Sequence, residues 1–331
     1  MKLLVTGGCG FIFSNFIRYI LNKYPDYEVI NLDVLFYSGR LENTEDFKDN
    51  PRYRFVKGNI CDTLLVDKLM REVDCVINGA AQTHVDRSIL DPYEFIRTNI
   101  LGTHVLLETA RKHKIKKFIQ ISTDEVYGSI EKGKFTEENP LKPNSPYSAS
   151  KAGADLLVLA YFKTYGLPVL ITRSGNNYGP YAYPEKMIPL FITNLLEGKK
   201  VPLYGDGLNI RDWLYVLDNC SGIDTVLHKG KEGEIYNIGA DNEKTNREIT
   251  EIILKELDKD ETWVEYIKDR PGHDRRYAID SKKIKNLGWE LKYNFEKAIK
   301  ETIEWYKNNQ DWWKKIKSGE YLEYYKKQYS K

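Results

Sequence analysis

Tyr147 and Lys151 are separated by four positions in the segment Tyr-Ser-Ala-Ser-Lys, which follows Pro146. The pattern over Tyr147–Tyr165 predicts a helix, and because residues i and i+4 share a helix face, the phenol and the ammonium should point the same way. A neighbouring cation stabilises a phenolate and lowers the pKa of the tyrosine, so Tyr147 is a candidate base near neutral pH. Inert surface pairs have the same spacing, but a helix start that follows a series of strand–helix units favours a catalytic role.

Two adjacent carboxyl groups, Asp124 and Glu125, directly follow the predicted strand Lys117–Thr123. The carboxyl ends of parallel strands are where open α/β sheets place their chemistry. On an ordinary loop such a pair would be solvated surface, whereas beside a hydroxyl base the two groups can serve as an acid and a base with separate pKa values. We therefore interpret both as candidate catalytic residues.

A glycine-rich turn follows the first predicted strand, Leu3–Thr6, and precedes a helix. Glycines at such a turn let the backbone curl tightly and let a pyrophosphate sit on the helix N-terminus, where free N–H groups and the helix dipole favour anions. Gly7 and Gly10 fit the dinucleotide-binding spacing, but Phe13 occupies the third glycine position, so we expect its ring to push the helix outward or to rotate it. On its own, the interrupted pattern does not separate a cofactor site from an ordinary turn.

Asp33 strengthens the cofactor interpretation. It lies 20 residues after Phe13, at the C-terminal end of the next predicted strand. A carboxylate there can accept hydrogen bonds from the adenosine ribose hydroxyls, and its charge repels a 2′-phosphate. The sequence therefore predicts NAD rather than NADP, with a solvated strand-end residue as the plainer alternative.

The elements that must position these residues alternate between short apolar segments and longer amphipathic ones. The predicted strands are Leu3–Thr6, Glu28–Asp33, Tyr53–Lys57, Asp74–Asn78, Lys117–Thr123 and Pro168–Arg173. The predicted helices between them are Phe11–Lys23, Leu64–Val73, Tyr93–His113 and Tyr147–Tyr165. Such alternation predicts parallel strands joined by right-handed crossovers, which is a Rossmann-like, doubly wound α/β sheet.

The second half of the chain has a different rhythm. Residues 175–184 are predicted as a loop, and an apolar helix follows from Lys186. A strand over Glu234–Ile238, a helix over Thr245–Leu257 with Thr245 or Asn246 as its N-cap, and a pair of helices within residues 294–329 complete it. We predict an NAD-binding Rossmann domain over residues 1–175, to which a segment of about 208–240 returns, and a smaller α+β substrate lobe over 176–331.

Charge and cysteine spacing argue against several classes of protein. The 50 basic and 48 acidic side chains nearly cancel, so no strong net charge recruits nucleic acid. Apolar stretches are far shorter than the roughly 20 residues of a membrane-spanning helix, and no signal peptide precedes the first strand, so we expect a cytoplasmic protein without a membrane partner. The cysteines show neither Cys-x-x-Cys spacing nor i, i+4 pairing with histidine, so we expect free thiols and no metal site: Cys9, Cys61, Cys75 and Cys220.

Several segments together resemble the dTDP-glucose 4,6-dehydratases, which are of the extended short-chain dehydrogenase type. The resemblance runs from residue 1 to beyond residue 289, and its segments are Ala80–Ser88, Ser122–Gly128, Tyr147–Lys151, Asn176–Pro180, Arg211–Trp213 and Asp269–Arg276. Thr123-Asp124-Glu125 is the specific part. Related epimerases usually carry small or hydroxyl residues at the Asp124 position, and related decarboxylases often have Ser-Glu.

The resemblance implies a reaction without net redox change on a nucleoside-diphosphate glucose, with NAD as the cofactor. Tyr147, assisted by Lys151, would take the proton of the sugar 4-hydroxyl while hydride passes from C4 to NAD⁺, and Thr123 would hydrogen-bond the same oxygen. Glu125 would remove the C5 proton that the new 4-keto group acidifies, and Asp124 would protonate the departing 6-hydroxyl. Return of the hydride to C6 would leave a 4-keto-6-deoxy sugar.

The resemblance also implies binding contacts and an assembly. The implied cofactor-binding residues are Gly7, Gly10, Phe11, Ile12, Asp33, Asn59, Ile60, Ala80, Ala81, Thr98, Tyr147, Lys151 and Asn177. The implied substrate-binding residues are Thr83, Asn176, Lys186, Arg211, Asn246, Arg270 and His273. Two arginines among them suit a diphosphate, because a guanidinium can bind two phosphate oxygens at once. Such enzymes are typically homodimers, and Leu101–His113 and Ala152–Tyr165 would supply the interface helices.

Three positions depart from the family pattern, and all three touch cofactor binding: Phe13, Asn59 and Gln82 stand where glycine, aspartate and glutamate are usual. We expect altered NAD affinity with the chemistry retained. A protein that binds NAD or a sugar nucleotide without turnover stays open, although it would not need both carboxylates. A 4-epimerase would leave Asp124 idle, and a uronate decarboxylase would need a further arginine beside residues 123–125. The sequence leaves thymidine and uridine nucleotides both open.

Overall fold

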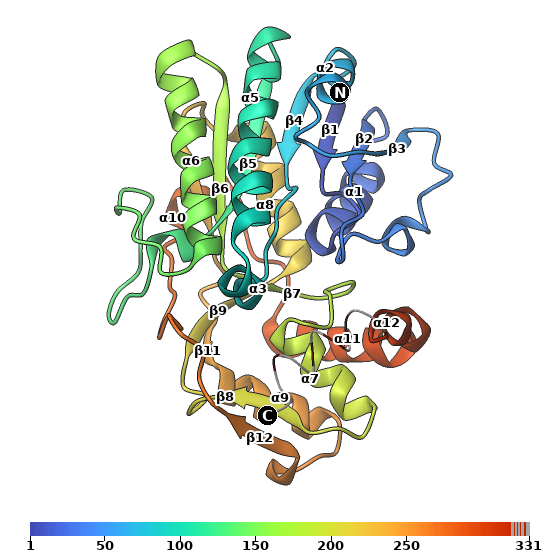
Figure 1. Cartoon of the computed structure of the whole chain (residues 1–331), viewed down its shortest axis with the longest axis vertical. Helices are drawn as coiled ribbons and strands as arrows, with labels where there is room; N and C mark the ends of the chain where they lie inside the picture. Colours follow the sequence, from blue (N-terminus) through green and yellow to red (C-terminus); the bar gives the residue numbers. More distant parts are fainter. Residues whose placement is uncertain (319–320, 322, 324, 326–327, 329–331) are drawn as a thin grey trace.

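The centre of the fold is a parallel sheet whose seven strands run in the order β10-β6-β5-β4-β1-β2-β3 (Figure 1). The computed structural model describes residues 1–318 together with residues 321, 323, 325 and 328. The sheet strands are β1 (Lys2–Thr6), β2 (Glu28–Asp33), β3 (Tyr53–Lys57), β4 (Cys75–Asn78), β5 (Lys117–Thr123), β6 (Val169–Ser174) and β10 (Ile235–Ile238). Because the order reverses between β1 and β4, the carboxyl ends of these strands open a crevice of the kind that binds ligands in doubly wound sheets.

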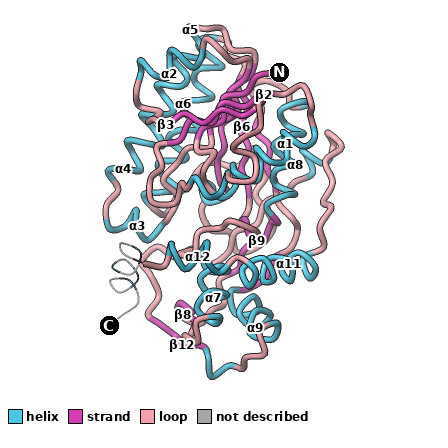
Figure 2. Tube along the Cα trace, turned by 90° about the vertical axis from the view of Figure 1, so that its right-hand side faces the viewer, coloured by secondary structure: helices cyan, strands magenta, loops and turns pink. Residues whose placement is uncertain are grey.

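Helices cover both faces of this sheet, which explains its apolar strands. The helices α1 (Phe11–Lys23) and α8 (Val216–Lys229) pack together on one face, while the other face is covered by α2 (Thr63–Met70), α5 (Thr103–Lys112) and α6 (Pro146–Tyr165) (Figure 2). Leu3 and Val5 are buried on the α1 side and Leu4 on the other, as a doubly covered strand requires. The predicted Rossmann-like α/β fold is confirmed.

The stretch that the sequence predicts as one helix, Tyr93–His113, changes pitch along its length. A short α4 (Tyr93–Phe95) passes into the π-helical segment η2 (Ile96–Gly102) and then into α5. Such π segments are frequent at functional sites. This one brings Asn99 against Gln82, whose main-chain N–H donates to Asn99 Oδ1 at 2.9 Å, while Gly102 leaves room for Ile60. Apolar periodicity alone does not reveal such a change of pitch.

A second lobe lies beyond the carboxyl ends of the sheet (Figure 1). Its core packs α7 (Met187–Leu196) against α9 (Asn246–Glu256) and α11 (Phe295–Asn308), and α12 (Gln310–Ile316) follows. A three-stranded sheet has the order β11-β9-β7, and β12 pairs with β8. These strands are β7 (Asn176–Tyr178), β8 (Val201–Tyr204), β9 (Ile210–Tyr215), β11 (Glu243–Thr245) and β12 (Val264–Ile267). The prediction of a continuous loop over residues 175–184 is therefore wrong, because β9 supplies a pairing partner for Asn176–Tyr178.

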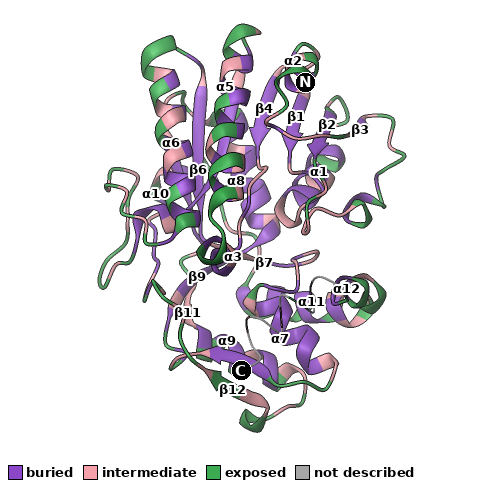
Figure 3. Cartoon of the chain, in the orientation of Figure 1, coloured by how far each residue is buried: buried purple, intermediate pink, exposed green. Residues whose placement is uncertain are grey.

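Short helices connect these parts: η1 (Leu41–Thr44), α3 (Val85–Leu90), η3 (Asp124–Tyr127), η4 (Glu261–Trp263) and α10 (Lys282–Lys285). Thr245 caps α9 as predicted, in a capping box with Glu248. Buried residues concentrate along the strands and on the inner helix faces (Figure 3).

The predicted helix pair in 294–329 is present as α11 and α12, and its last part falls largely outside the described residues. Strand β10 lies within the segment of about 208–240 that the sequence predicts to return to the first domain, and its pairing with β6 brings it back to the large sheet. The domain boundary at residue 175 stays a prediction. Across the described part of the chain, no helix combines the length and the apolar character needed to cross a membrane.

Candidate active site

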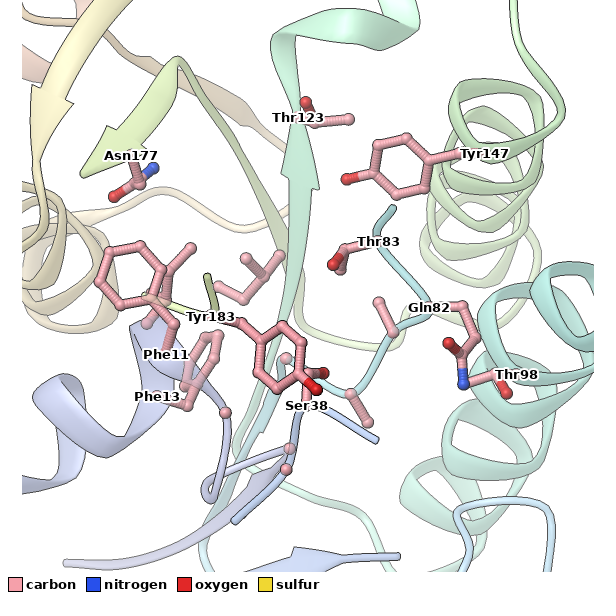
Figure 4. Close-up of a pocket in the computed structure, with 18 of the residues that line it drawn as sticks. Phe11, Phe13, Ser38, Gln82, Thr83, Thr98, Thr123, Tyr147, Asn177 and Tyr183 are labelled. Atoms are coloured by element: carbon pink, nitrogen blue, oxygen red, sulfur yellow. The ribbon is translucent and has the colours of Figure 1, made fainter. Parts of the chain in front are cut away.

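A cavity of about 530 Å³ opens at the carboxyl ends of the central strands and is lined by residues of both the sheet and the second lobe. Every predicted catalytic residue and every predicted cofactor residue lines it. Three predicted substrate residues also line it, namely Thr83, Asn176 and Lys186. The other four are not part of its wall: Arg211, Asn246, Arg270 and His273. Figure 4 shows side chains from β5, α6, the π-helical segment and the start of α1 converging on this space.

The start of α6 positions Tyr147 and Lys151 on successive turns. The helix begins sharply because Ser145 forms a capping box at its N-terminus. The Tyr147 side chain reaches from α6 toward the end of β5, where Thr123 lies (Figure 4). Lys151 Nζ donates to the main-chain oxygen of Ile121 at 2.5 Å. Tyr147 and Lys151 therefore both line the cavity from α6, and the pairing of phenol and ammonium stays a prediction.

The pKa of Tyr147 differs from what the sequence predicts. Burial, followed by the charges of Glu125 and Asp124, raises the pKa of Tyr147 well above its ordinary value. Burial also lowers the pKa of Lys151 to about 8, because an ammonium is costly in a dry site. The predicted net lowering of the Tyr147 pKa is therefore wrong for the protein alone. Burial and the two neighbouring carboxylates therefore favour the neutral phenol of Tyr147.

Asp124 and Glu125 are neighbours in the chain but have different surroundings. Asp124 is 2% exposed, its Oδ1 accepts a hydrogen bond from Thr123 Oγ1 at 3.2 Å, and its Oδ2 has no partner among the described residues. Burial, and then the charges of Glu125 and Asp212, raise the pKa of Asp124 well above its usual range. Burial raises the pKa of Glu125 as well. Three cations oppose that second rise, namely Lys186, Arg270 and Arg211. Asp124 is thus the better proton donor and Glu125 the better acceptor.

The turn before α1 leaves a helix N-terminus open toward the cavity. Gly10 is the N-cap of α1, and in the described structure no side chain caps it and no acidic residue lies in the first turn. The first N–H groups of α1 therefore suit an anion. Gly7 has a φ of +73°, and a Cβ there would lie 2.9 Å from the backbone of Ala80, so both conformation and space require glycine.

Phe13 is accommodated by a second glycine. Its ring is 3% exposed and lies against Gly79, where a Cβ would come within 2.2 Å of the ring. Gly79 therefore supplies the space that the third glycine of the usual pattern would supply. An outward shift of α1 stays a prediction.

Asp33 ends β2 beside the same turn. Its Oδ2 accepts the N–H of Cys9 at 2.9 Å, and its Oδ1 accepts the N–H of Leu35 at 2.8 Å. Burial raises the pKa of Asp33, and these two hydrogen bonds oppose the rise. The amide oxygens of Asn176 and Asn177 are buried without a hydrogen-bond partner in the described residues, so they are available to a ligand. The remaining predicted cofactor contacts also line the cavity: Phe11, Ile12, Asn59, Ile60, Ala80, Ala81 and Thr98.

The second lobe places cations beside the carboxyl pair. Lys186 Nζ donates to the main-chain oxygen of Thr83 at 2.9 Å, which holds the ammonium inside the cavity. Arg270 forms an ion pair with the buried Asp86 at 2.7 Å, and its Nε is buried without a partner among the described residues. Arg211 is only 5% exposed, and its charge acts on both Asp124 and Glu125.

His273 and Asn246 make their contacts within the second lobe. His273 pairs with Asp269 at 2.6 Å, and burial and the neighbouring arginines lower the pKa of His273 to about 4. Asn246 begins α9, and its main-chain N–H donates to the oxygen of Asn209 at 3.0 Å. The structure therefore brings His273 beside the cationic cluster and leaves Asn246 away from the cavity wall.

The family model for GDP-mannose 4,6 dehydratase matches residues 4–302 of this chain. The chain belongs to this family. It is 50% identical to the dTDP-glucose 4,6-dehydratase of Streptomyces antibioticus over 96% of each chain. The solved dTDP-glucose 4,6-dehydratase of Streptomyces venezuelae, with NAD bound, matches with a TM-score of 0.94 and 50% identity over 96% of this chain and 100% of that one. The enzyme from Bacillus anthracis, in complex with NAD, matches with a TM-score of 0.90 and 54% identity over 96% and 99%. The resemblance that the motifs indicate is confirmed.

Part of the wall in this member of the dehydratase family escaped prediction. Glu185 is buried, accepting hydrogen bonds from the Tyr37 hydroxyl at 2.8 Å and from Arg87 at 3.1 Å. These contacts join the segment after β2 and helix α3 to the segment before α7. In the sequence, the one local indication of Glu185 is that it directly precedes Lys186. Other wall residues have no motif of their own, among them Ser38 and Tyr183.

Proposed function

We propose that this chain is an NAD-dependent 4,6-dehydratase that converts a nucleoside-diphosphate glucose, with dTDP-glucose as the first candidate, to its 4-keto-6-deoxy derivative. The observation that supports it most is the different surroundings of Asp124 and Glu125: the first is buried among carboxylates, and the second faces cations. Elimination of water needs an acid and a base in one site, and this pair provides both. The relatives at about 50% identity, which are dTDP-glucose 4,6-dehydratases, support the same reaction and the thymidine nucleotide.

The residues at one end of the cavity fit NAD. The open N-terminus of α1 suits the pyrophosphate, and Asp33 lies where a carboxylate can accept the ribose hydroxyls. The free amide oxygens of Asn176 and Asn177 suit hydrogen-bond donors of a ligand in the cavity. When bound, NAD supplies a reversible hydride acceptor for C4 and a hydride donor for C6.

The proton transfers belong to residues of the chain. Tyr147 takes the proton of the sugar 4-hydroxyl, with Thr123 hydrogen-bonded to the same oxygen and the Lys151 ammonium favouring the phenolate. Glu125 removes the C5 proton, because the cations around it favour its ionised form. Asp124, whose protonated form is favoured by burial and by the neighbouring carboxylates, gives its proton to the departing 6-hydroxyl, which leaves as water.

The cationic cluster of the second lobe binds the diphosphate in this proposal. Arg270 and Arg211 present guanidinium groups next to the catalytic carboxyl pair, and Lys186 adds an ammonium inside the cavity. His273 has a lowered pKa and is neutral there, so it serves as a hydrogen-bonding group. The sugar then lies between this cluster and Tyr147, with Thr83 beside it.

We further propose a cytoplasmic homodimer. Large apolar side chains are exposed on the neighbouring segments η2 and α6, where a second copy would cover them: Ile96, Leu101, Leu156 and Tyr165. The four cysteines are free thiols, as a reducing compartment favours. Sedimentation of the purified protein at twice the mass of the chain would support the dimer, and a monomer would contradict it.

The function is tested by mixing the protein with NAD⁺ and dTDP-glucose, with UDP-glucose in parallel, and following the keto sugar by its absorbance in base. Turnover of one nucleotide that falls by about 10²–10⁴ in Glu125→Gln is the expected result, because a general base contributes about that much. Glu94→Gln, at another wall position, is the matched control and should retain turnover. No keto sugar from either nucleotide at saturating NAD⁺ would rule out the dehydratase assignment.

A further inference from the structure

Asp155 and Arg173 form a buried ion pair next to the catalytic helix face. Arg173 Nε donates to Asp155 Oδ2 at 2.9 Å, and the two residues are 1% and 0% exposed. Charges taken out of water are costly, and replacing a buried pair by apolar side chains is often neutral or stabilising. A pair at this depth beside an active site therefore needs a reason other than stability.

The pair lies directly behind the proposed catalytic groups. Asp155 follows Lys151 by one helical turn and Tyr147 by two, so the three side chains share one face of α6. Asp155 Oδ2 also accepts a hydrogen bond at 3.0 Å from Ser122 Oγ, directly before Thr123 in the chain. Its Oδ1 is buried without a hydrogen-bond partner among the described residues. One carboxylate thus contacts the end of β5 and faces the turn that contains the lysine.

We propose that Asp155 is a positioning residue: its carboxylate is the counter-charge that keeps Lys151 an ammonium beside Tyr147, and its contact with Ser122 fixes the end of β5. This inference rests on the proposed function for the roles of Tyr147 and Lys151. Burial by itself favours the neutral amine, so without a fixed negative charge the phenolate would lose its cation.

The other charged groups around α6 act elsewhere. Asp124 and Glu125 act on Tyr147 from η3. The guanidinium of Arg173 is held 4.7 Å from the centre of the Tyr127 ring and donates to the Tyr127 hydroxyl at 2.8 Å. Charged side chains on the remaining elements packed against α6 pair with other groups: Asp86 with Arg270, Arg87 with Glu185, Arg97 with Glu94, His104 with Tyr161, and Arg111 with Glu108. Within the described chain, Asp155 is the charged group whose attraction supports the ammonium of Lys151.

The proposal is tested by titrating the ¹³Cε signal of Lys151 in lysine-labelled protein, assigned through its loss in Lys151→Met. In the unaltered protein the ammonium should deprotonate near pH 8. In Asp155→Asn the titration should move to lower pH by about one unit or more, as for loss of a nearby opposite charge. The alkaline limb of the turnover rate should move by the same amount. An unchanged Lys151 titration in Asp155→Asn would overturn the proposal.

Three further variants separate charge from packing. Ser122→Ala removes a neutral hydrogen bond and should leave the Lys151 titration unchanged, and a shift as large as that of Asp155→Asn would overturn the electrostatic role. Asp155→Glu keeps the charge and should restore the titration. Asp155→Asn combined with Arg173→Met removes both members of the ion pair, so the arginine is not left buried without its partner, and covers the case in which the single variant unfolds. The pH at which Lys151 titrates should be lowered in this double variant too, and an unchanged titration would overturn the proposal. Failure of the dehydratase assignment is recognised separately, as absent turnover with a normal Lys151 titration.

Discussion

Replacing Asp124 by asparagine should stop the reaction after C4 oxidation and before loss of water. Asparagine keeps the size of the uncharged carboxyl but has no acidic proton to give to the leaving hydroxyl. Removal of a general acid costs about 10²–10⁴ in rate, which corresponds to about 3–5 kcal/mol in the barrier at about 1.4 kcal/mol per tenfold. Tyr147 and Lys151 are unchanged in this variant, so the first proton transfer should stay fast.

Stability gives the same substitution a second, independent readout. The folded-state pKa of Asp124 is raised, so the folded protein binds this proton more tightly than the unfolded chain does. Stability is therefore lost as pH rises from the ordinary value of about 4 toward the folded pKa. Asparagine does not titrate, so the thermal midpoint of Asp124→Asn relative to the unaltered protein should increase as pH rises through that window.

The assay is a single turnover with excess enzyme and bound NAD⁺, followed at 340 nm for the reduced cofactor and in base for the keto sugar. The variant should accumulate reduced cofactor at an unaltered rate and form keto sugar about 10²–10⁴ times more slowly. Keto sugar formed at the normal rate would refute the role of Asp124 as the acid. Loss of the reduced-cofactor signal would place Asp124 in the first step instead. A midpoint difference that does not change with pH would refute the raised pKa.

Two further predictions address packing and substrate binding. Gly79→Ala should destabilise the protein by about 1–3 kcal/mol, because its Cβ would lie 2.2 Å from the Phe13 ring. Phe13→Ala should lower the free energy of unfolding by about 3–5 kcal/mol. The double variant should lose less than the sum of the two single losses. Additive losses in urea unfolding would contradict this packing. Arg270→Lys should raise KM for the sugar nucleotide by about 10–100-fold with kcat nearly unchanged, since a charge-assisted hydrogen bond contributes about 1.5–3 kcal/mol. Steady-state kinetics decides it, and an unchanged KM would remove Arg270 from the diphosphate site.

The sheet could be predicted closely because its information is local. The bounds of β2, β3, β5 and α1 agree with the sequence prediction to the residue, since apolar runs and glycine turns determine them within a few positions. The strand β7 could not be predicted in the same way, because Asn176–Tyr178 is polar and becomes a strand only through pairing with β9. The π-helical turn at Ile96–Gly102 depends on packing against residues from elsewhere in the chain, which a helical period does not record.

The site was predictable in composition but not in its electrostatics. Motifs placed all the catalytic candidates in one cavity, because the carboxyl ends of β1, β2 and β5 and the start of α6 meet there. The direction of the pKa shift of Tyr147 was predicted wrongly. The spacing to Lys151 reveals a cation, but it does not reveal the cost of burying the phenolate or the two carboxylates that face it.

Charges from distant parts of the chain also give Asp124 and Glu125 separate roles. They are adjacent in the chain, so nothing local distinguishes them, and the difference comes from the cations that the second lobe places beside Glu125. Those cations lie at the N-cap of α7, in β9 and in the segment after β12, which approach only when the two lobes pack together. A fully folded second lobe is therefore required for the acid and the base to differ, and substitutions that loosen it should reduce elimination more than C4 oxidation.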